Sequence, residues 1–452
     1  MHSKVKYNGT DIFIAIMVLF CSLCFIYSYD VNAVLTITDE FKKCLFDGNV
    51  KNFYKIAFDY SVVENEPGYL PLYNILCYFS VFLMLLPIYF VEFIAGTSFI
   101  ALKTFWYKLC LGAIALLAGE RLRKIGKQMG LSDAAAGSMK NLYLSSAFVL
   151  AGAVGFGQLD IIGAYIFLWA IWFYVKKDYV KFSVVTSIAV CFKGFVLLFY
   201  IPMLLVRKKK DSDIIKNILL CSILPLVITI VCRFMSGYSE VKEEAQNSWN
   251  HLSRLWEVYF PTGHSSSAFI ITVLIIFIFA YFMNSDKDKS WIGICCLSGF
   301  CFMFFIRFNP QWLVVVVPFL CLAVYVFEDK LFNALTFLLV NVGYLIMLMI
   351  ITANGTVHEL IVDGLLGTFI NWKNPEGYLI GIIWLNNISE RTVTSIFYAG
   401  IILMTLSLIF ELRGKHLFNI PNKHSEQILN KSTYINLSVV IVYTLLTFAA
   451  HI

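Results

Sequence analysis

The sequence is dominated by long apolar runs separated by short loops that are rich in lysine and arginine. Examples of these runs are residues 218–232, 269–283 and 331–351. A helix of about 20 apolar residues crosses the hydrocarbon core of a bilayer. Helices and closed barrels are the structures that satisfy their own backbone hydrogen bonds there. The pattern predicts an all-α, polytopic membrane helical bundle of roughly 11–13 transmembrane or re-entrant helices.

Composition supports this class of protein. The chain has 452 residues, of which 59% are hydrophobic and 14% are charged. A soluble globular protein is about 45–50% apolar and about 25% charged. The net charge of +6 indicates no nucleic-acid partner. Eleven of the 12 cysteines lie in apolar runs, with no paired motif typical of a disulfide framework or a zinc site.

The positions of the cationic loops predict how the chain is threaded. Such loops are retained on the cytoplasmic side, so Lys4 and Lys6 place the start of the first span, residues 12–27, inside. The acid-rich segment 29–68 would then lie outside, and the basic cluster 121–127 inside. Between an outer and an inner segment the chain must cross the membrane an odd number of times, but two apolar runs separate these segments. We expect the run 70–91, broken by Pro87, to lie along or re-enter the outer leaflet. An N-terminus outside the cell is the alternative.

The remaining segments follow the same rule. Residues 142–155 are expected to cross outward and 161–175 to return. The whole chain, 1–452, is expected to form one integral-membrane domain. Its outer loops are predicted at residues 29–98, which include membrane-lying helices, and at 233–267 and 352–392.

The run 182–206 must begin and end inside, between two cationic loops. Its length of about 25 residues is too short for two full helical crossings. We therefore predict a broken hairpin with its tip near Lys193 and Gly194. Irregular backbone at membrane depth is tolerated where it lines protein or a water-filled cavity. An ionisable side chain there is a candidate for function.

The predicted topology places several polar residues on one outer face, namely Asp30, Gln158, Asp160, Lys193, Arg307 and Gln311. A carboxylate suits the role of general base when it reaches the proton that it removes. Nearby cations stabilise charge that develops on a phosphate. Sugar transfer from a lipid-linked phosphate donor requires both functions.

Four short motifs occur in order over about residues 20–320: Tyr29-Asp30-Val31-Asn32, Gly68-Tyr69-Leu70-Pro71-Leu72-Tyr73, Gly157-Gln158-Leu159-Asp160 with Phe192-Lys193-Gly194, and Arg307-Phe308-Asn309-Pro310-Gln311-Trp312. Together they resemble the GT-C superfamily of integral-membrane glycosyltransferases, especially the polyprenyl-phosphate-sugar-dependent, mannosyltransferase-like members. The resemblance implies a hexosyltransferase of the plasma membrane with its site on the outer face. It also implies a role in polysaccharide biosynthesis of the cell envelope. The implied partners are a polyprenyl-phosphate-linked sugar, a glycan or lipid acceptor, and membrane lipid.

By this resemblance Asp30 is the catalytic base of an inverting transfer. Many relatives have a second acid where this chain has Asn32, so no cofactor is expected to be required, and a divalent metal stays an open alternative. Asp39 or Glu40 is the alternative base. The substrate-binding residues that we expect are Asn32, Asp39, Glu40, Tyr69, Gln158, Asp160, Lys193, Arg254, Arg307 and Gln311.

Each candidate also has a purely structural interpretation. Asp30 would be a solvated helix end, and Gln158 and Asp160 would cap a turn. Lys193 would extend to the membrane surface, and Arg307 would anchor there. Two other functions fit the same residues. The first is a transporter or flippase for a lipid-linked sugar or small anion, and the second is a non-catalytic partner in a glycan-export complex.

Overall fold

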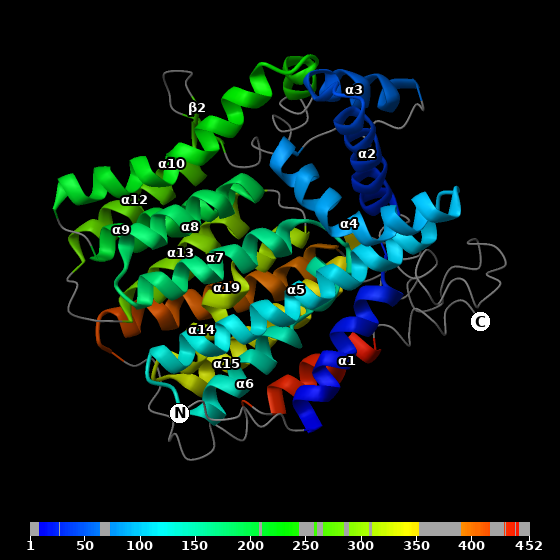
Figure 1. The fold of residues 1–452 in the computed structure, drawn as a ribbon. Coiled ribbons are helices and arrows are strands. Elements are labelled where there is room, and N and C mark those ends of the chain that lie inside the picture. The colour runs from blue at the N-terminus through cyan, green and yellow to red at the C-terminus, as the bar shows by residue number, and fades with distance from the viewer. Residues whose placement is uncertain are drawn as a thin grey trace, which may run out of the picture. The chain divides into compact units, whose positions relative to one another are not determined.

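The computed structural model describes residues 9–26, 28–63, 73–207, 210–243, 257–259, 265–283, 289–306, 310–351, 390–415, 429, 431–438 and 440–442 (Figure 1). These residues are almost entirely helical. By length and composition, five of the helices are able to cross a membrane. The chain is an all-α polytopic membrane protein, as its sequence predicts. One short hairpin, β1 (Glu257–Tyr259) with β2 (Ser265–Ser267), is the exception among the described residues.

The chain divides into two compact units. The first unit contains Met1–Tyr27, Leu111–Gly157 and Leu320–Ile452, and the second contains Ser28–Cys110 and Gln158–Phe319. Two helices, α5 (Ile100–Gln128) and α14 (Val317–Val326), have residues in both units.

The first unit is built from α1, the end of α5, α6, η3, α15 and α19. A buried lysine joins three of its helices, because Lys140 Nζ lies 2.7 Å from Asp11 Oδ1 and 3.1 Å from Glu120 Oε1. Opposite charges and hydrogen bonds offset the cost of burying this cation. The bounds of the elements not yet given are α1 (Gly9–Cys24), α6 (Asp133–Leu144), η3 (Phe148–Gly155), α15 (Lys330–Ile351) and α19 (Glu390–Leu412).

The expected crossing over residues 142–155 is not one helix. Helix α6 ends at Leu144, and η3 is a π-helical segment that begins at Phe148. Between them, the hydroxyl of Ser146 donates to Tyr143 O, and Ala147 N donates to Asn341 Oδ1 at 2.8 Å. These side chains replace the backbone partners that a continuous helix would supply, so the chain bends here.

The second unit holds most of the predicted site residues. It begins with α2 (Ser28–Phe46), η1 (Val50–Asn52), α3 (Phe53–Val63) and α4 (Ile75–Ala95). It continues through α7 (Asp160–Val175), α8 (Tyr179–Phe192), η4 (Gly194–Val196), α9 (Leu197–Arg207) and α10 (Asp211–Arg233). It is completed by α12 (Ala268–Phe282), α13 (Ser290–Phe305) and η6 (Pro310–Val315).

Helix α4 corrects the expectation that its run is broken at Pro87. It is continuous over 21 residues and is one of the five helices long enough to cross a membrane. Asn74 caps its start, since Oδ1 accepts from Leu76 N and Cys77 N. Gly96, with φ of 67°, ends it in the left-handed conformation that favours glycine. A proline removes one hydrogen bond from a helix, and the loss here does not interrupt α4.

The predicted break in 182–206 is confirmed. Lys193 is extended, with φ of −150° and ψ of 108°, between α8 and η4. Helices α8 and α9 fold back on each other, because Ser183 Oγ lies 2.8 Å from the hydroxyl of Tyr200. Asn217 of α10 accepts from both hydroxyls, through Oδ1 and its backbone carbonyl, at 2.8 Å each. Lys193 therefore stands at the tip of a helical hairpin.

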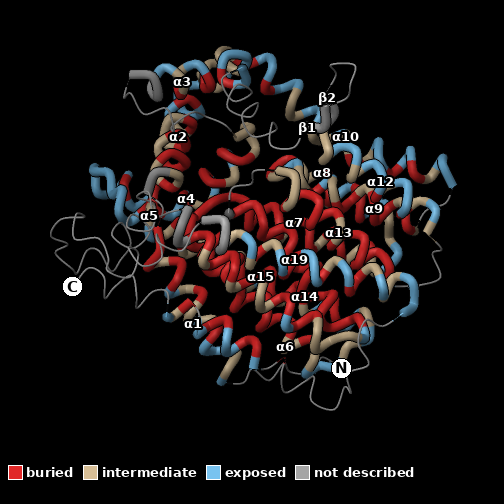
Figure 2. The backbone as a smooth tube through the Cα atoms, turned by 180° about the vertical axis from the view of Figure 1, so that it is seen from behind, coloured by how far each residue is buried: buried red, intermediate tan, exposed pale blue. Residues whose placement is uncertain are grey.

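Burial separates the helices of the second unit into inner and outer ones. Helices α7 and α13 are mostly buried, whereas α10 and α12 present many exposed residues (Figure 2). Many of the exposed residues of the outer helices are large and apolar, for example Leu219, Leu226 and Ile275. Such a surface suits lipid as its surroundings.

Candidate functional site

The candidate site begins with a carboxylate and an amide that meet from distant parts of the second unit. Asp30 lies in the first turn of α2, where the helix dipole favours negative charge. Its Oδ2 accepts a hydrogen bond from Nε2 of Gln158, a buried residue just before α7. Oε1 of Gln158 accepts from the hydroxyl of Tyr73 at 3.5 Å. Gln158 thus connects the start of α2 to the segment before α4.

A buried ion pair lies two residues further along. Asp160, the first residue of α7, is 3% exposed, and its Oδ1 is 2.5 Å from Nζ of Lys193. The other oxygen, Oδ2, has no hydrogen-bond partner among the described residues. A buried carboxylate oxygen without a partner is costly. It is therefore suited to accept a hydrogen bond from a ligand.

Two small features bring these elements together. A Cβ on Gly163 would lie 3.2 Å from Cβ of Phe192 and 3.4 Å from Cβ of Lys193, so glycine lets the end of α8 approach α7 closely. Asn74, besides capping α4, donates from Nδ2 to the backbone carbonyl of Cys191 at 2.5 Å. That carbonyl belongs to the last turn of α8, where backbone carbonyls have no N–H partner within the helix.

Aromatic rings surround the ammonium group of Lys193. Nζ lies 4.8 Å from the ring centroid of Trp312 and 5.2 Å from that of Phe195. Cation–π contacts at these distances hold a lysine head in place when it is shielded from water. Gln311, next to Trp312, is buried, and its Oε1 has no hydrogen-bond partner among the described residues.

The electrostatic surroundings give Asp30 an unusual proton affinity. Burial raises the pKa of its carboxyl to about 6. The hydrogen bond from Gln158 lowers the pKa, the charge of Asp160 raises it and that of Lys193 lowers it. A carboxylate with a pKa near the working pH is a better proton acceptor than one with an ordinary pKa.

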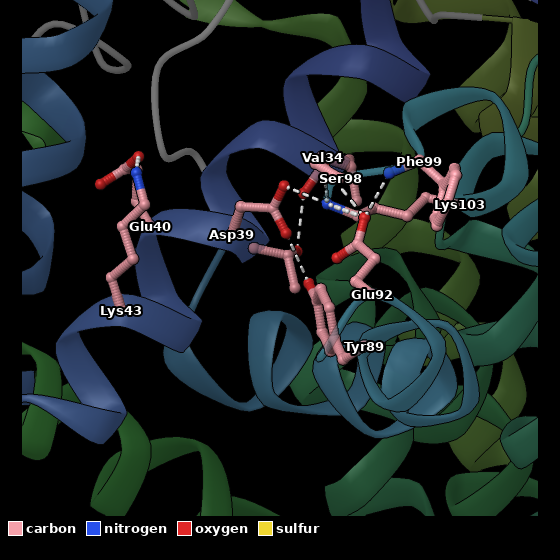
Figure 3. Close-up of polar contacts among 10 residues, drawn as sticks. Val34, Asp39, Glu40, Lys43, Tyr89, Glu92, Ser98, Phe99 and Lys103 are labelled. Atoms are coloured by element: carbon pink, nitrogen blue, oxygen red, sulfur yellow. Dashed lines mark hydrogen bonds and ion pairs between the residues drawn. The ribbon is translucent and has the colours of Figure 1, made fainter. Parts of the chain in front are cut away.

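Asp39 and Glu40 lie elsewhere on the same helix. Asp39 is nine residues after Asp30, which corresponds to about 14 Å along α2. Its Oδ2 lies 2.7 Å from Nζ of Lys103, and its Oδ1 accepts from the hydroxyl of Tyr89 at 2.8 Å (Figure 3). Glu40 instead pairs with the exposed Lys43 at 2.6 Å. The structure does not bring either residue to Asp30, and their role in substrate binding stays a prediction.

The other predicted residues are placed as follows. Asn32 is half-buried two positions after Asp30, and residues two apart on a helix do not face each other. This spacing separates Asn32 from the Gln158 contact. Tyr69, Arg254 and Arg307 lie outside the described residues. Most of the predicted outer loops, 233–267 and 352–392, lie outside them as well.

Tyr73, Asn74 and Trp312 are site residues that were not predicted from the sequence. Two of them belong to motifs quoted above, Tyr73 to the aromatic-Pro-Leu segment and Trp312 to the Asn-Pro-Gln segment. Asn74 precedes an apolar run, which is the usual position of a helix cap. Those signals were present but did not show which side chains reach Lys193 or Gln158.

Within the described ranges, no three His, Cys, Asp or Glu side chains gather closely enough to hold a metal ion. Comparison of the chain with models of protein families gives no match, and comparison with curated proteins gives none.

Proposed function

We propose that this protein is a membrane glycosyltransferase that moves a monosaccharide from a polyprenyl-phosphate donor to a glycan or lipid acceptor. The observation that carries the proposal is the meeting of Asp30, Gln158, Asp160 and Lys193 at helix ends in one unit. A half-buried base, a partnerless carboxylate oxygen and a fixed cation supply the groups that sugar transfer needs.

Asp30 is the base in this proposal. The acceptor hydroxyl gives its proton to the Asp30 carboxylate while its oxygen bonds to the anomeric carbon of the sugar. The bond from that carbon to the phosphate oxygen breaks, and the lipid phosphate leaves with the electron pair. Attack from the face opposite the phosphate inverts the anomeric configuration. Gln158 holds the Asp30 carboxylate in position through its amide.

Lys193 and Asp160 act as a pair. An ammonium group has three N–H donors, and Asp160 accepts one of them. The remaining donors suit the departing phosphate, whose negative charge grows during the transfer. Oδ2 of Asp160 suits a hydroxyl of the sugar. No cofactor is required in this scheme.

The finer localisation follows from the cationic loops. Their positions support an outer location for the tip of the α8–α9 hairpin, so we propose that the site faces the outside of the plasma membrane. A mannose-like hexose and a cell-envelope acceptor are the substrates that the motif resemblance favours.

The test is transfer by purified protein in liposomes, with a panel of synthetic polyprenyl-phosphate hexoses and release of the lipid phosphate as the readout. We expect Asp30→Asn to lower the rate about 10²–10⁴-fold, the range for loss of a general base. Asp59→Asn is the matched control, because Asp59 is exposed on α3 of the same unit. Equal activity in the wild type and the Asp30→Asn variant would remove Asp30 from its role.

The alternative is a transporter or flippase for a lipid-linked sugar or small anion. The helix break at Lys193, with its buried ion pair, favours it, because broken helices often form transporter sites. Movement of the intact lipid-linked sugar across a liposome membrane, with no new glycosidic bond, would support this alternative against transfer.

A further inference from the structure

The turn between α4 and α5 is flanked by large, exposed apolar side chains. Residues 93–102 are all exposed, and Figure 2 shows this end of the helices in pale blue. The large side chains among them are apolar: Phe93 is 84% exposed, Ile94 69% and Ile100 66%. Between Phe90 and Leu102 the sequence has a single charged residue, Glu92, and it is buried.

Three charged side chains near this turn, those of Lys103, Asp39 and Glu92, face one another. Lys103, 2% exposed, directs its ammonium toward Asp39 Oδ2 at 2.7 Å, Glu92 Oε1 at 3.1 Å and Ser98 Oγ at 3.3 Å (Figure 3). These three acceptors match the three donors of an ammonium group. Oε1 of Glu92 also accepts from Phe99 N at 2.7 Å. The cluster thus supplies internally the partners that water supplies in a solvated turn.

A cavity of about 920 Å³ lies beside this cluster, between α2 and the turn. Its apolar wall consists of Phe46, Leu86, Phe90, Phe93 and Ile100. Helix α2 also contributes the charged residues Glu40, Lys42 and Lys43 to the lining. Most of the residues of the apolar wall belong to the same exposed apolar surface. The cavity is therefore continuous with that surface.

We propose that the α4–α5 turn lies within the hydrocarbon of the bilayer and that lipid chains cover residues 90–100 and the apolar wall of the cavity. Helices α4 and α5 both have an apolar composition suited to lipid, so the exposed side chains beside the turn continue a lipid-facing surface. Water is a poor solvent for that surface. A charged cluster is tolerated at membrane depth when it is paired and turned toward protein. The inference does not depend on the proposed transferase activity.

The α7–α8 turn provides the internal control. It joins two apolar helices, as the α4–α5 turn does, but its residues are Lys176, Lys177 and Asp178, and both lysines are exposed. This turn has the composition expected in water.

The experiment places single spin labels at cysteines introduced by Phe93→Cys, Ile94→Cys, Leu86→Cys and Lys176→Cys in protein reconstituted into phosphatidylcholine liposomes. The native cysteines are buried or, for Cys110, half-buried, and labelled wild type measures their background. Collision rates with oxygen, which concentrates in hydrocarbon, are compared with those of a water-soluble nickel chelate. Size-exclusion profiles verify that each variant is folded.

We expect the labels at positions 93, 94 and 86 to collide preferentially with oxygen and the label at 176 to collide preferentially with the nickel chelate. Preference for the chelate at 93 and 94 would overturn the proposal. Shielding of those labels from both reagents would also overturn it, because a second copy of the chain or another protein would then cover the turn.

Discussion

The ammonium of Lys193 lies 2.5 Å from Oδ1 of Asp160, although 33 positions separate the two residues in the chain. The pair joins the start of α7 to the break after α8. Both side chains are largely buried, so neither charge is compensated by water. The position of the hairpin tip therefore depends on the same two side chains that are proposed to bind the substrate.

Removing one charge of this pair is expected to destabilise the protein. Lys193→Met leaves the Asp160 carboxylate buried and unpaired, and such a loss typically costs about 3–5 kcal/mol. The double variant Lys193→Met, Asp160→Leu removes both charges and should recover most of that free energy. The measurement is thermal unfolding of the purified variants in detergent.

The matched control is Lys181→Met, which breaks an exposed ion pair with Asp178. Exposed pairs contribute about 0–1 kcal/mol, so little change is expected. If the double variant is no more stable than Lys193→Met, the buried pair is not the source of the loss.

Gly163 is expected to resist substitution because of its neighbours. A β-carbon there lies at 3.2 Å from Cβ of Phe192, which Ala accommodates only if the α8 end moves by a few tenths of an ångström. Gly163→Val adds further bulk and should cost about 1–3 kcal/mol, as overpacking does. Thermal unfolding measures the loss of stability, and the transfer rate measures the effect of moving Lys193.

Gly137→Ala is the comparison, because a Cβ at this helical position meets nothing within 4 Å. Alanine is favoured over glycine inside a helix by about 0.5–1 kcal/mol, so this variant should be slightly more stable than wild type. A Gly163→Val protein as stable and active as wild type would contradict the close packing of α7 and α8.

The raised pKa of Asp30, about 6, predicts a specific pH dependence. A base must be deprotonated, so kcat/KM should rise with pH through about 6, and this profile reports the free enzyme. Gln158→Leu removes the hydrogen bond that lowers the pKa and should move the rise to higher pH. An unchanged profile in that variant would show that another group controls the rate.

The same carboxyl makes stability depend on pH in the opposite direction. Its pKa is raised from 3.8 to about 6 on folding, so the native state binds the proton more tightly. The contribution of Asp30 to the free energy of unfolding is fully present below pH 3.8 and is lost as pH rises through about 6. Asp30→Asn should abolish this component, which denaturation at several pH values measures.

The Lys103 cluster predicts a loss of stability with little loss of chemistry. Lys103→Met leaves the buried carboxylate of Glu92 and the partly exposed carboxylate of Asp39 without their shared cation. Removal of one partner from a buried ion pair costs about 3–5 kcal/mol. Asp39→Asn keeps the shape of the side chain and is expected to lower the transfer rate per folded molecule far less than Asp30→Asn does. Unfolding in detergent and the transfer assay separate the two effects.

Lys43→Met serves as the control, since Lys43 is exposed and its pair with Glu40 joins neighbouring turns of α2. Its effect on unfolding should be within about 0.5 kcal/mol. A rate loss in Asp39→Asn as large as that in Asp30→Asn would restore Asp39 as the alternative base.

Several features of the site were predictable because they depend on local chemistry. Positive residues on both sides of 182–206 required a break near Lys193, and the backbone there is extended. Asp30, Gln158 and Asp160 were expected to lie near Lys193 because the threading of the spans placed them on one face. The continuity of α4 through Pro87 was not predictable in this way, because a helix can absorb the missing hydrogen bond of a proline.

The apolar runs and the polar residues that interrupt them are sufficient to predict a helical membrane protein, because hydrocarbon excludes unpaired backbone and charge. The pairing of the polar groups depends instead on how the helices pack. The tertiary structure separates Asp39 from Asp30 on one helix and joins Tyr73, Gln158 and Asp30 from three segments. These pairings depend on distances between side chains that are far apart in the chain, and apolar periodicity does not determine such distances.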